Sequence, residues 1–307
     1  MTFITDQQTL DDLGIFGRRG ADSVYAIFNR TMTRQGSAVL EDMLRHPLSD
    51  AAAIGTRSSI FQSFAVLGIP FPFRSELFDV AEAYLSVTDE RTRLSGDAQT
   101  LGSRMASLIA EDNDYKNIYK GITALMEILQ GLRRFVTGGT PDAYGQEKEM
   151  IESMLAEGEL QPLLQEDVKS KLPFNRVAGY DNVLRFRHRG MARRLLQQVY
   201  RLDAYLAVGR VAVERGFVFP VVLPAEIPGD RQRVLLEGVY HPQVKNAVAN
   251  TVEITADQPV IFLTGANMAG KSTFMKSLGV ALFLAQDRKS TRLNSSHPVS
   301  SRMPSSA

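Results

Sequence analysis

The sequence predicts a mainly α-helical domain followed by the first part of an α/β domain. Three observations support this fold class. Apolar residues recur at spacings of three and four through much of residues 1–215, as on one face of a helix. Short β-branched and apolar runs, separated by Pro, Gly and Asp, begin after Gly216. A glycine-rich loop then lies between an apolar run and a helical segment, which is the order of elements in an α/β unit.

The composition indicates a folded protein with no disulfide framework. Its 307 residues are 44% hydrophobic and 22% charged, which is enough for a large core and for two domains. Lys+Arg 35 against Asp+Glu 34 gives a formal net charge of +1, so no global basic field indicates a nucleic-acid partner. The absence of cysteine excludes a cysteine zinc finger and a thiol nucleophile. With no apolar signal core and no run of 18 apolar residues, we expect a cytoplasmic protein without a membrane span.

Helical periodicity is clear in four segments. These are residues 21–44, 118–135, 147–164 and 191–213. In the first segment, Gly36 marks either a close approach or a break, and Pro47 follows its end. The last segment has the strongest pattern, with apolar residues at spacings of four, three and four: Leu195, Val199, Leu202 and Leu206.

Strand patterns follow in the second part of the chain. The expected strands are residues 217–224, 234–236, 252–254 and 259–264. The last is a continuous apolar run of the kind found in a central strand, and residues 273–285 read as the helix after it.

Between that run and that helix lies the phosphate-loop pattern G-x-x-x-x-G-K-[ST]. Gly265, Gly270, Lys271 and Ser272 satisfy it. Glycines let the backbone turn its N–H groups toward phosphate oxygens, and the helix that follows adds its N-terminal dipole. We expect Lys271 to reach the β- and γ-phosphates of ATP and the Ser272 hydroxyl to bind Mg²⁺. The alternative is a glycine turn with an unrelated lysine, but the predicted strand before the loop and helix after it favour a phosphate site.

The loop also resembles a particular family. Its residues are Thr264-Gly265-Ala266-Asn267-Met268-Ala269-Gly270-Lys271-Ser272-Thr273. This sequence resembles the P-loop of the MutS family of DNA mismatch-repair ATPases, whose distinguishing feature is Asn-Met inside the loop. The family usually has Pro and Gly where this chain has Ala266 and Ala269. The resemblance implies that residues 265–273 contact ATP.

The resemblance continues upstream of the loop. Tyr240-His241-Pro242 is similar to the family's Arg-His-Pro segment, and residues 248–252 are similar to the strand entry that lies near the adenine. Asn250 fits that pattern and is expected in the nucleotide site. Many relatives place an aromatic residue where this chain has Ala247 or Val248, so no aromatic stacking on the base is expected.

The helical part resembles the family's core, or lever, domain, in residues 27–36 and again in 191–213. The resemblance implies a helical MutS-like core domain over 1–215 and the N-terminal part of a P-loop ATPase domain over 216–286. Neither a mismatch-recognition domain nor a Phe-x-Glu wedge is present, and Walker B, the signature segment and the dimerising C-terminus do not follow the loop. We therefore expect a short relative of the family, truncated after its P-loop.

Residues 287–307 hold seven serines in 21 residues and have no periodicity. Parts of this segment resemble the in-frame translation of a common sequencing adapter. We expect a non-native or disordered tail.

The resemblance implies a DNA-repair ATPase of the P-loop, ABC-like class that binds ATP, Mg²⁺ and double-stranded DNA and forms a homodimer when intact. No catalytic residue is assigned, and no hydrolysis is expected of this 307-residue chain. The alternatives are a nucleotide-dependent scaffold without turnover and another P-loop ATPase.

A basic stretch near the start of the last helical segment has two interpretations. Its residues are Arg185, Arg187, His188, Arg189, Arg193, Arg194 and Arg201. It forms either a phosphate-contacting surface or a solvated helix face, and we favour the latter. The histidines have no partner residues at the spacing that metal ligands usually show, so no metal site built on histidine is expected. We interpret Asp89-Glu90 as a helix end or loop rather than a Walker B carboxylate pair.

Overall fold

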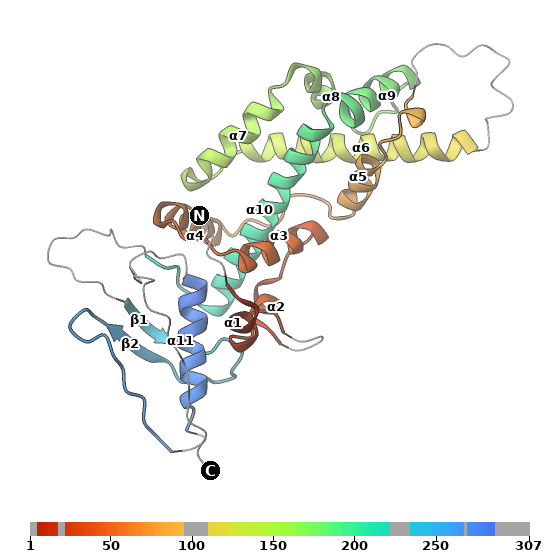
Figure 1. The fold of residues 1–307 in the computed structure, drawn as a ribbon. Helices are drawn as coiled ribbons and strands as arrows, with labels where there is room; N and C mark the ends of the chain where they lie inside the picture. The colour runs from red at the N-terminus through yellow and green to blue at the C-terminus, as the bar shows by residue number, and fades with distance from the viewer. Residues whose placement is uncertain (1–4, 18–21, 95–109, 222–233, 267–268, 286–307) are drawn as a thin grey trace, which may run out of the picture. The chain divides into compact units, whose positions relative to one another are not determined.

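The computed structural model describes residues 5–17, 22–94, 110–221, 234–266 and 269–285. It is mainly helical, as the sequence predicts (Figure 1). The α-helices are α1 (Gln7–Asp12), α2 (Val24–Phe28), α3 (Arg34–Arg45), α4 (Ala51–Leu67), α5 (Glu76–Ser86), α6 (Ala110–Thr137), α7 (Gly145–Leu155), α8 (Gln161–Gln165), α9 (Phe174–Asp181), α10 (Arg189–Arg215) and α11 (Lys271–Ala285). The 3₁₀ turns are η1 (Glu90–Thr92), η2 (Asp142–Tyr144) and η3 (Gly158–Leu160), η4 (Asn182–Arg187) is a π-helix, and the strands are β1 (Val234–Val239) and β2 (Asn250–Ile254). Within the described ranges, no helix is long and apolar enough to cross a membrane.

The chain divides into two compact units. Unit 1 comprises Met1–Ala26, Leu44–Ser58 and Phe219–Ala307, and unit 2 comprises Ile27–Met43 and Ser59–Val218. Each is described separately below.

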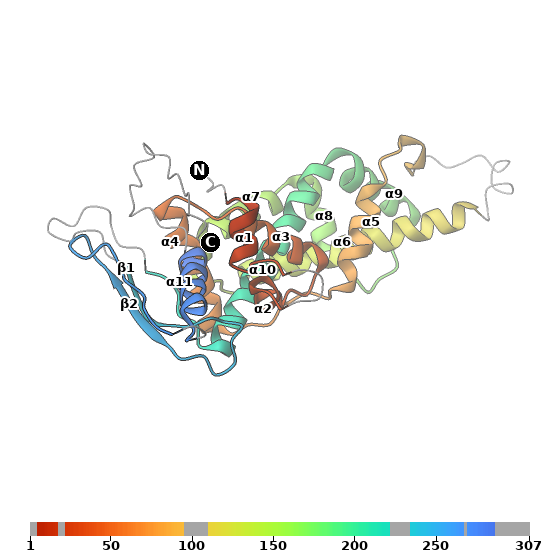
Figure 2. The same ribbon diagram turned by 60° about the horizontal axis from the view of Figure 1, so that its bottom comes forward.

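Unit 2 is built around α6 and α10. α5 packs against α6 and crosses it in both views of the ribbon (Figures 1 and 2). Leu125, Leu129 and Leu132, on the apolar face of α6, are fully buried. The helix predicted over 118–135 is therefore confirmed, and it extends beyond the predicted bounds at both ends.

α10 confirms the strongest helical pattern of the sequence. The four residues that define its apolar stripe are all buried: Leu195, Val199, Leu202 and Leu206. The helix ends because Gly216 adopts the left-handed conformation at φ +65°, and the Phe217 N–H then donates to the Ala212 carbonyl at 2.9 Å. Glycine suits this cap because it lacks the Cβ that penalises a positive φ.

The segment 21–44 forms two helices instead of one. α2 ends at Phe28 and α3 begins at Arg34. The side chain of Thr33 caps α3, since its Oγ1 accepts the Gly36 N–H at 2.9 Å. Gly36 itself lies buried inside α3, where an added Cβ would meet Asp203 Oδ2 at 2.3 Å. Gly36 therefore marks a close approach, and the break lies before it.

The single helix predicted over 147–164 is also wrong. α7 ends at Leu155, and the chain turns through η3 before α8 begins. Pro162 has no N–H and clashes with the preceding turn of a continuous helix, but it is tolerated in the first turn of α8. The apolar residues Leu160, Leu163 and Leu164 are nevertheless buried, so the periodicity indicated the core face correctly.

Unit 1 contains an antiparallel pair of strands and the helix α11, which contacts β1 (Figures 1 and 2). Val234 pairs with Ile254 and Leu236 with Val252, and the register shifts between Leu236 and Val239. Gly238 has a φ of +66° at this irregularity, which is a glycine position in a β-bulge. The strands predicted at 234–236 and 252–254 are confirmed.

The strand predicted over 259–264 is not formed. Of the strand predicted over 217–224, residues 217–221 form no strand, and residues 222–224 lie outside the described residues. Val260 is 65% exposed and Phe262 is 89% exposed. A strand needs a neighbour to pair its backbone N–H and C=O groups. In the described part of the chain, the paired strands are β1 and β2, and neither pairs with this run. An apolar sequence with high strand propensity therefore remains irregular.

Candidate functional site

The loop before α11 has the backbone that its glycines allow. Gly265 has a φ of +156° and Gly270 a φ of +87°, both unfavourable for residues with a side chain. Apart from its chain neighbours and the nearby helix backbone, no atom of the described structure lies within 4 Å of a Cβ placed on Gly270, so the backbone angle, and not the available space, requires glycine there. Asn267 and Met268 lie outside the described residues.

The loop leads directly into the N-terminus of a 15-residue helix. α11 begins at Lys271, and the first helical bond runs from the Phe274 N–H to the Gly270 carbonyl at 2.9 Å. The N–H groups of the first helical turn have no partner within the helix, and together with the helix dipole they favour an anion. Ser272 and Thr273 are exposed in this turn, so the Ser272 hydroxyl is accessible to a cation held beside such an anion.

The Lys271 side chain folds back over the loop. Its Nζ donates to the Gly265 carbonyl and, at 2.7 Å, to the Ala266 carbonyl. The geometry therefore brings Gly265, Ala266 and Lys271 together, with a positive charge above the loop and the start of α11. Carbonyl oxygens are weaker partners for an ammonium group than phosphate oxygens, because the latter carry charge.

α11 is positioned by buried contacts within unit 1. Val280 and Phe283 are buried on one side of the helix. A Cβ added to Gly279 would lie 2.6 Å from Leu13 Cδ2, so glycine at this position lets the segment after α1 approach α11 closely. His241 is only 8% exposed, and burial together with the nearby Lys276 ammonium lowers the pKa of its ring below the ordinary value of 6.5.

Asn250 is the first residue of β2 and is exposed. Its Nδ2 donates to the Val248 carbonyl at 3.0 Å, which orders the start of the strand. No interaction recorded among the described residues joins Asn250 to the loop. Its place in a nucleotide site therefore stays a prediction.

The basic stretch is divided between side chains engaged within unit 2 and side chains exposed on α10. Arg187 and His188 both bind Glu159, at 2.6 and 2.7 Å, and Arg189 donates to the Leu85 carbonyl at 2.8 Å. The side chains of Arg193, Arg194 and Arg201 are exposed on α10. Most of the stretch is thus engaged within unit 2 or solvated.

Arg185 belongs to a buried polar cluster that the sequence pattern did not reveal. Its guanidinium binds both oxygens of Asp181, at 2.8 and 2.6 Å, and also binds Thr92. The Tyr84 hydroxyl donates to Asp181 at 2.8 Å, and burial beside this carboxylate raises the pKa of Tyr84 above its ordinary value. The i, i+4 spacing of Asp181 and Arg185 was the available signal, but their burial depends on residues some 90 positions away.

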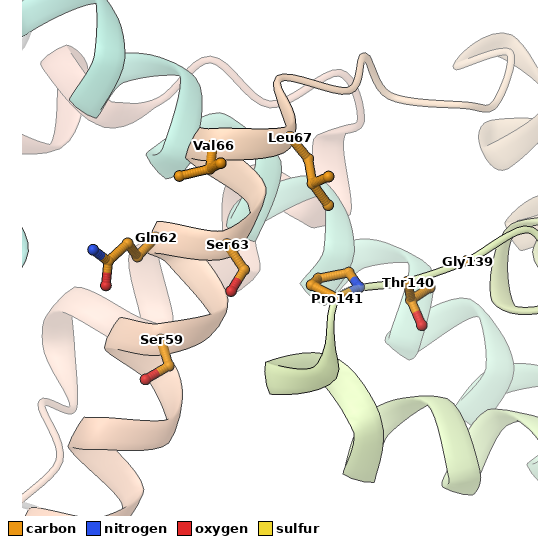
Figure 3. A pocket seen from close by; sticks show the side chains of 8 residues that line it. All are labelled: Ser59, Gln62, Ser63, Val66, Leu67, Gly139, Thr140 and Pro141. Carbon is orange, nitrogen blue, oxygen red and sulfur yellow. The ribbon is translucent and has the colours of Figure 1, made fainter.

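One open groove is visible on unit 2. It has a volume of about 570 Å³ and is lined by Ser59, Gln62, Ser63, Val66, Leu67, Gly139, Thr140 and Pro141 (Figure 3). No lining residue carries a charge, so the groove has no ionic partner for a phosphate group. Elsewhere in the described ranges, no group of acidic residues and histidines is placed to hold a metal ion.

Comparison with known proteins identifies the helical part. The family model of MutS domain III matches residues 8–257. The DNA mismatch repair protein MutS of Dehalococcoides mccartyi (strain CBDB1) is 28% identical over 214 residues, which cover 64% of this chain and 24% of that protein. The Endonuclease MutS2 of Streptococcus gordonii is 38% identical over 85 residues, 28% of this chain and 10% of that protein.

A third relative, the DNA mismatch repair protein MutS of Persephonella marina, is 32% identical over 94 residues, 29% of this chain and 10% of its own length. The chain thus spans about a quarter or less of the length of these curated relatives. The domain III match covers well over half of the chain. The chain therefore belongs to the MutS family.

Proposed function

We propose that this chain contributes the ATP-binding loop and the helical core of a MutS-like DNA-repair protein. The observation that supports nucleotide binding most strongly is the loop 265–270 at the start of α11. It combines two glycines at positive φ, the N-terminus of α11 and the Lys271 ammonium group. These are the groups that bind the phosphates of a nucleoside triphosphate.

The proposal gives each loop residue a role. The loop and first-turn N–H groups would hold phosphate oxygens, and Lys271 would exchange its two carbonyl partners for them. Ser272 would hold Mg²⁺ through its exposed hydroxyl. Asn267 and Met268 would complete the loop, and Asn250 would lie near the base, as the family resemblance implies.

DNA handling and dimerisation rest on family membership. Two of the relatives carry the name DNA mismatch repair protein. We propose that the intact protein couples nucleotide binding to the binding of double-stranded DNA and works as a homodimer. Residues 1–307 contain no Phe-x-Glu wedge, so we expect the duplex contacts made by these residues to be mainly to the backbone, which carries no direct sequence information. Matched and mismatched duplexes would then bind this 307-residue chain equally well.

A nucleotide series tests the phosphate site. The 307-residue chain is titrated calorimetrically with ATP, ADP and AMP, each with and without Mg²⁺. The proposal predicts that affinity falls from ATP to AMP and that Mg²⁺ strengthens ATP binding more than AMP binding, because the loop holds phosphate and not the base. Equal affinity for ATP and AMP would show that the loop is not a triphosphate site.

A further inference from the structure

Residues 88–94, here named the strap, follow α5 in unit 2 and contain the 3₁₀ turn η1. The strap is hydrogen-bonded internally. The Thr92 and Arg93 N–H groups donate to the Asp89 and Glu90 carbonyls, at 2.9 and 3.1 Å. The Thr92 hydroxyl also donates to the Asp89 carbonyl, at 2.7 Å. The strap is therefore a turn that can keep its own hydrogen bonds when its outer contacts change.

The contacts of the strap with the rest of unit 2 converge on one place. Among the described residues, its recorded hydrogen bonds to other elements end on Asp181, Asn182 and Arg185, where α9 meets η4. Thr92 and Leu94 are half-buried, and the other strap residues are exposed. Segments with few buried apolar contacts and an exposed backbone are those that open most easily in folded proteins.

Arg185 offers the two edges of its guanidinium to different partners. Nε and Nη2 donate to the two oxygens of Asp181, at 2.8 and 2.6 Å. Nη1 donates to the Thr92 hydroxyl and Nη2 to the Thr92 carbonyl, both at 2.8 Å. A planar guanidinium holds paired partners of this kind in a fixed fork geometry. A single strap residue, Thr92, thus accepts both hydrogen bonds of one edge.

The two edges differ in what their loss would cost. The side chains of Asp181 and Arg185 are 0% and 1% exposed, so separating them would leave a buried charge without its counter-ion. The Thr92 edge binds only neutral groups, and water replaces a neutral partner at a much smaller net cost. When Thr92 leaves, the ion pair remains, as does the hydrogen bond from the Tyr84 hydroxyl to Asp181. The strap can therefore open without breaking the buried pair.

We propose that the strap opens and closes as a unit while the helices of unit 2 stay folded, and that Thr92 is the latch that closes it on Arg185. The contacts above define the closed state. In the open state, the edge of Arg185 formed by Nη1 and Nη2 faces solvent, and the chain after α5 moves without unfolding that helix. This conformational device does not depend on nucleotide binding at residues 265–273.

Two other contacts could hold the strap closed. Leu94 packs against the core of unit 2, and the Arg93 guanidinium lies 5.4 Å from the centroid of the Phe186 ring. Neither contact involves the side chain of Thr92. A strap held by these contacts would be insensitive to loss of the Thr92 hydroxyl, so a variant that removes only this hydroxyl separates them from the proposed latch.

The test measures hydrogen–deuterium exchange of the full chain at the Thr92 and Arg93 N–H groups and in the buried part of α10. In the parent, the strap amides are expected to exchange at least about tenfold faster than those of α10, because local opening costs less than global unfolding. Thr92→Val removes the hydroxyl and should raise strap exchange at least about fivefold further, with α10 exchange unchanged. Thr92→Ser keeps the hydroxyl and is expected to stay within about twofold of the parent.

Thr123→Val is the matched control. Thr123 is also half-buried, but its recorded hydrogen bonds go to carbonyls of its own helix, α6, so strap exchange should not change. Trypsin gives a second readout, because Arg91 and Arg93 are exposed in the strap and cleavage after them follows the population of the open state. Thr92→Val should speed this cleavage, and Thr123→Val should not.

Three results would contradict the latch. Strap amides of the parent that exchange as slowly as those of α10 would show that the strap opens only when the whole unit unfolds. Equal strap exchange in the parent and Thr92→Val would show that other contacts hold the strap. A rise in α10 exchange as large as the rise in the strap would show that Thr92 stabilises the whole unit. None of these results depends on whether the chain binds ATP.

Discussion

Asp203 of α10 accepts a 2.7 Å hydrogen bond from the hydroxyl of Thr33, the residue that caps α3. The same carboxylate accepts the backbone N–H groups of Met32 and Thr33, at 2.9 and 2.8 Å. Gly36 provides the space for this contact, since a side chain there would meet the carboxylate. One buried acidic residue thus fixes the start of α3 against α10 within unit 2.

Replacing Asp203 with Asn should destabilise the protein by about 1–3 kcal/mol, because an amide presents N–H groups to donors and leaves buried groups unsatisfied. The free energy of unfolding in urea measures this. Asp79→Asn is the control, since the Asp79 side chain is 77% exposed and should tolerate the change without measurable effect. Equal stability of the two variants would show that the Asp203 contacts do not hold α3.

The buried Asp181–Arg185 pair should be far more sensitive than an exposed one. Arg185→Ala leaves the Asp181 charge buried without its partner, which is expected to destabilise the protein by about 3–5 kcal/mol. Arg91 pairs with Asp89 at the surface, and Arg91→Ala should leave the thermal midpoint unchanged within error. A similar midpoint for both variants would contradict the assigned burial.

Helix packing in unit 2 requires glycine at position 209. A Cβ there would lie 3.0 Å from the Ala65 nitrogen and 3.2 Å from the Phe61 carbonyl oxygen. Gly209→Ala should therefore destabilise the protein by about 1–3 kcal/mol, although alanine is the better helix former. Gly179→Ala in α9 has open space around its Cβ and should instead stabilise by about 0.5–1 kcal/mol. Denaturant unfolding compares the two, and a gain in stability from Gly209→Ala would refute the close approach.

The buried ring of His241 makes the stability of the protein depend on pH. The folded state keeps the ring neutral at pH values where the unfolded chain, with a His pKa near 6.5, is already protonated. Below pH 6.5, unfolding therefore takes up a proton. The stability that the neutral His241 ring contributes is complete above pH 6.5 and is lost as the pH falls from 6.5 toward the lowered pKa of the folded state. Thermal midpoints of the parent and of His241→Gln between pH 7.5 and 5.5 test this: the parent should lose more stability on acidification. Parallel curves would argue against a lowered pKa.

The spacing of apolar residues was sufficient to predict a helix that buries one face. It could not predict contacts between residues that are far apart in the sequence. α10 was predictable because Leu195, Val199, Leu202 and Leu206 repeat with the helical period and are all buried. Asp203 lies among them as a polar residue, and its partner Thr33 is 170 positions away, so only the fold reveals the pairing.

In two places the structure differs from the element that the sequence pattern predicts. Pro162 interrupts the pattern of 147–164, because a proline within a continuous helix removes a hydrogen bond. The apolar run 259–264 has strand propensity, but no strand of the described structure pairs with it. In the candidate site, Lys271 contacts the Gly265 carbonyl within one motif, whereas the burial of His241 depends on the fold of unit 1 and could not be predicted from the sequence.

The central claim is that residues 265–273 bind a nucleoside triphosphate through Lys271. The most direct test is a titration of Mg²⁺–ATP against the parent, Lys271→Ala and Lys276→Ala, with folding of each variant verified by circular dichroism. Lys276 lies on the same helix and is exposed, so it controls for the loss of one charge near the loop. We predict that Lys271→Ala weakens ATP binding at least about tenfold, or about 1.4 kcal/mol, while Lys276→Ala stays near the parent. Equal ATP affinity in the parent and Lys271→Ala would contradict the claim.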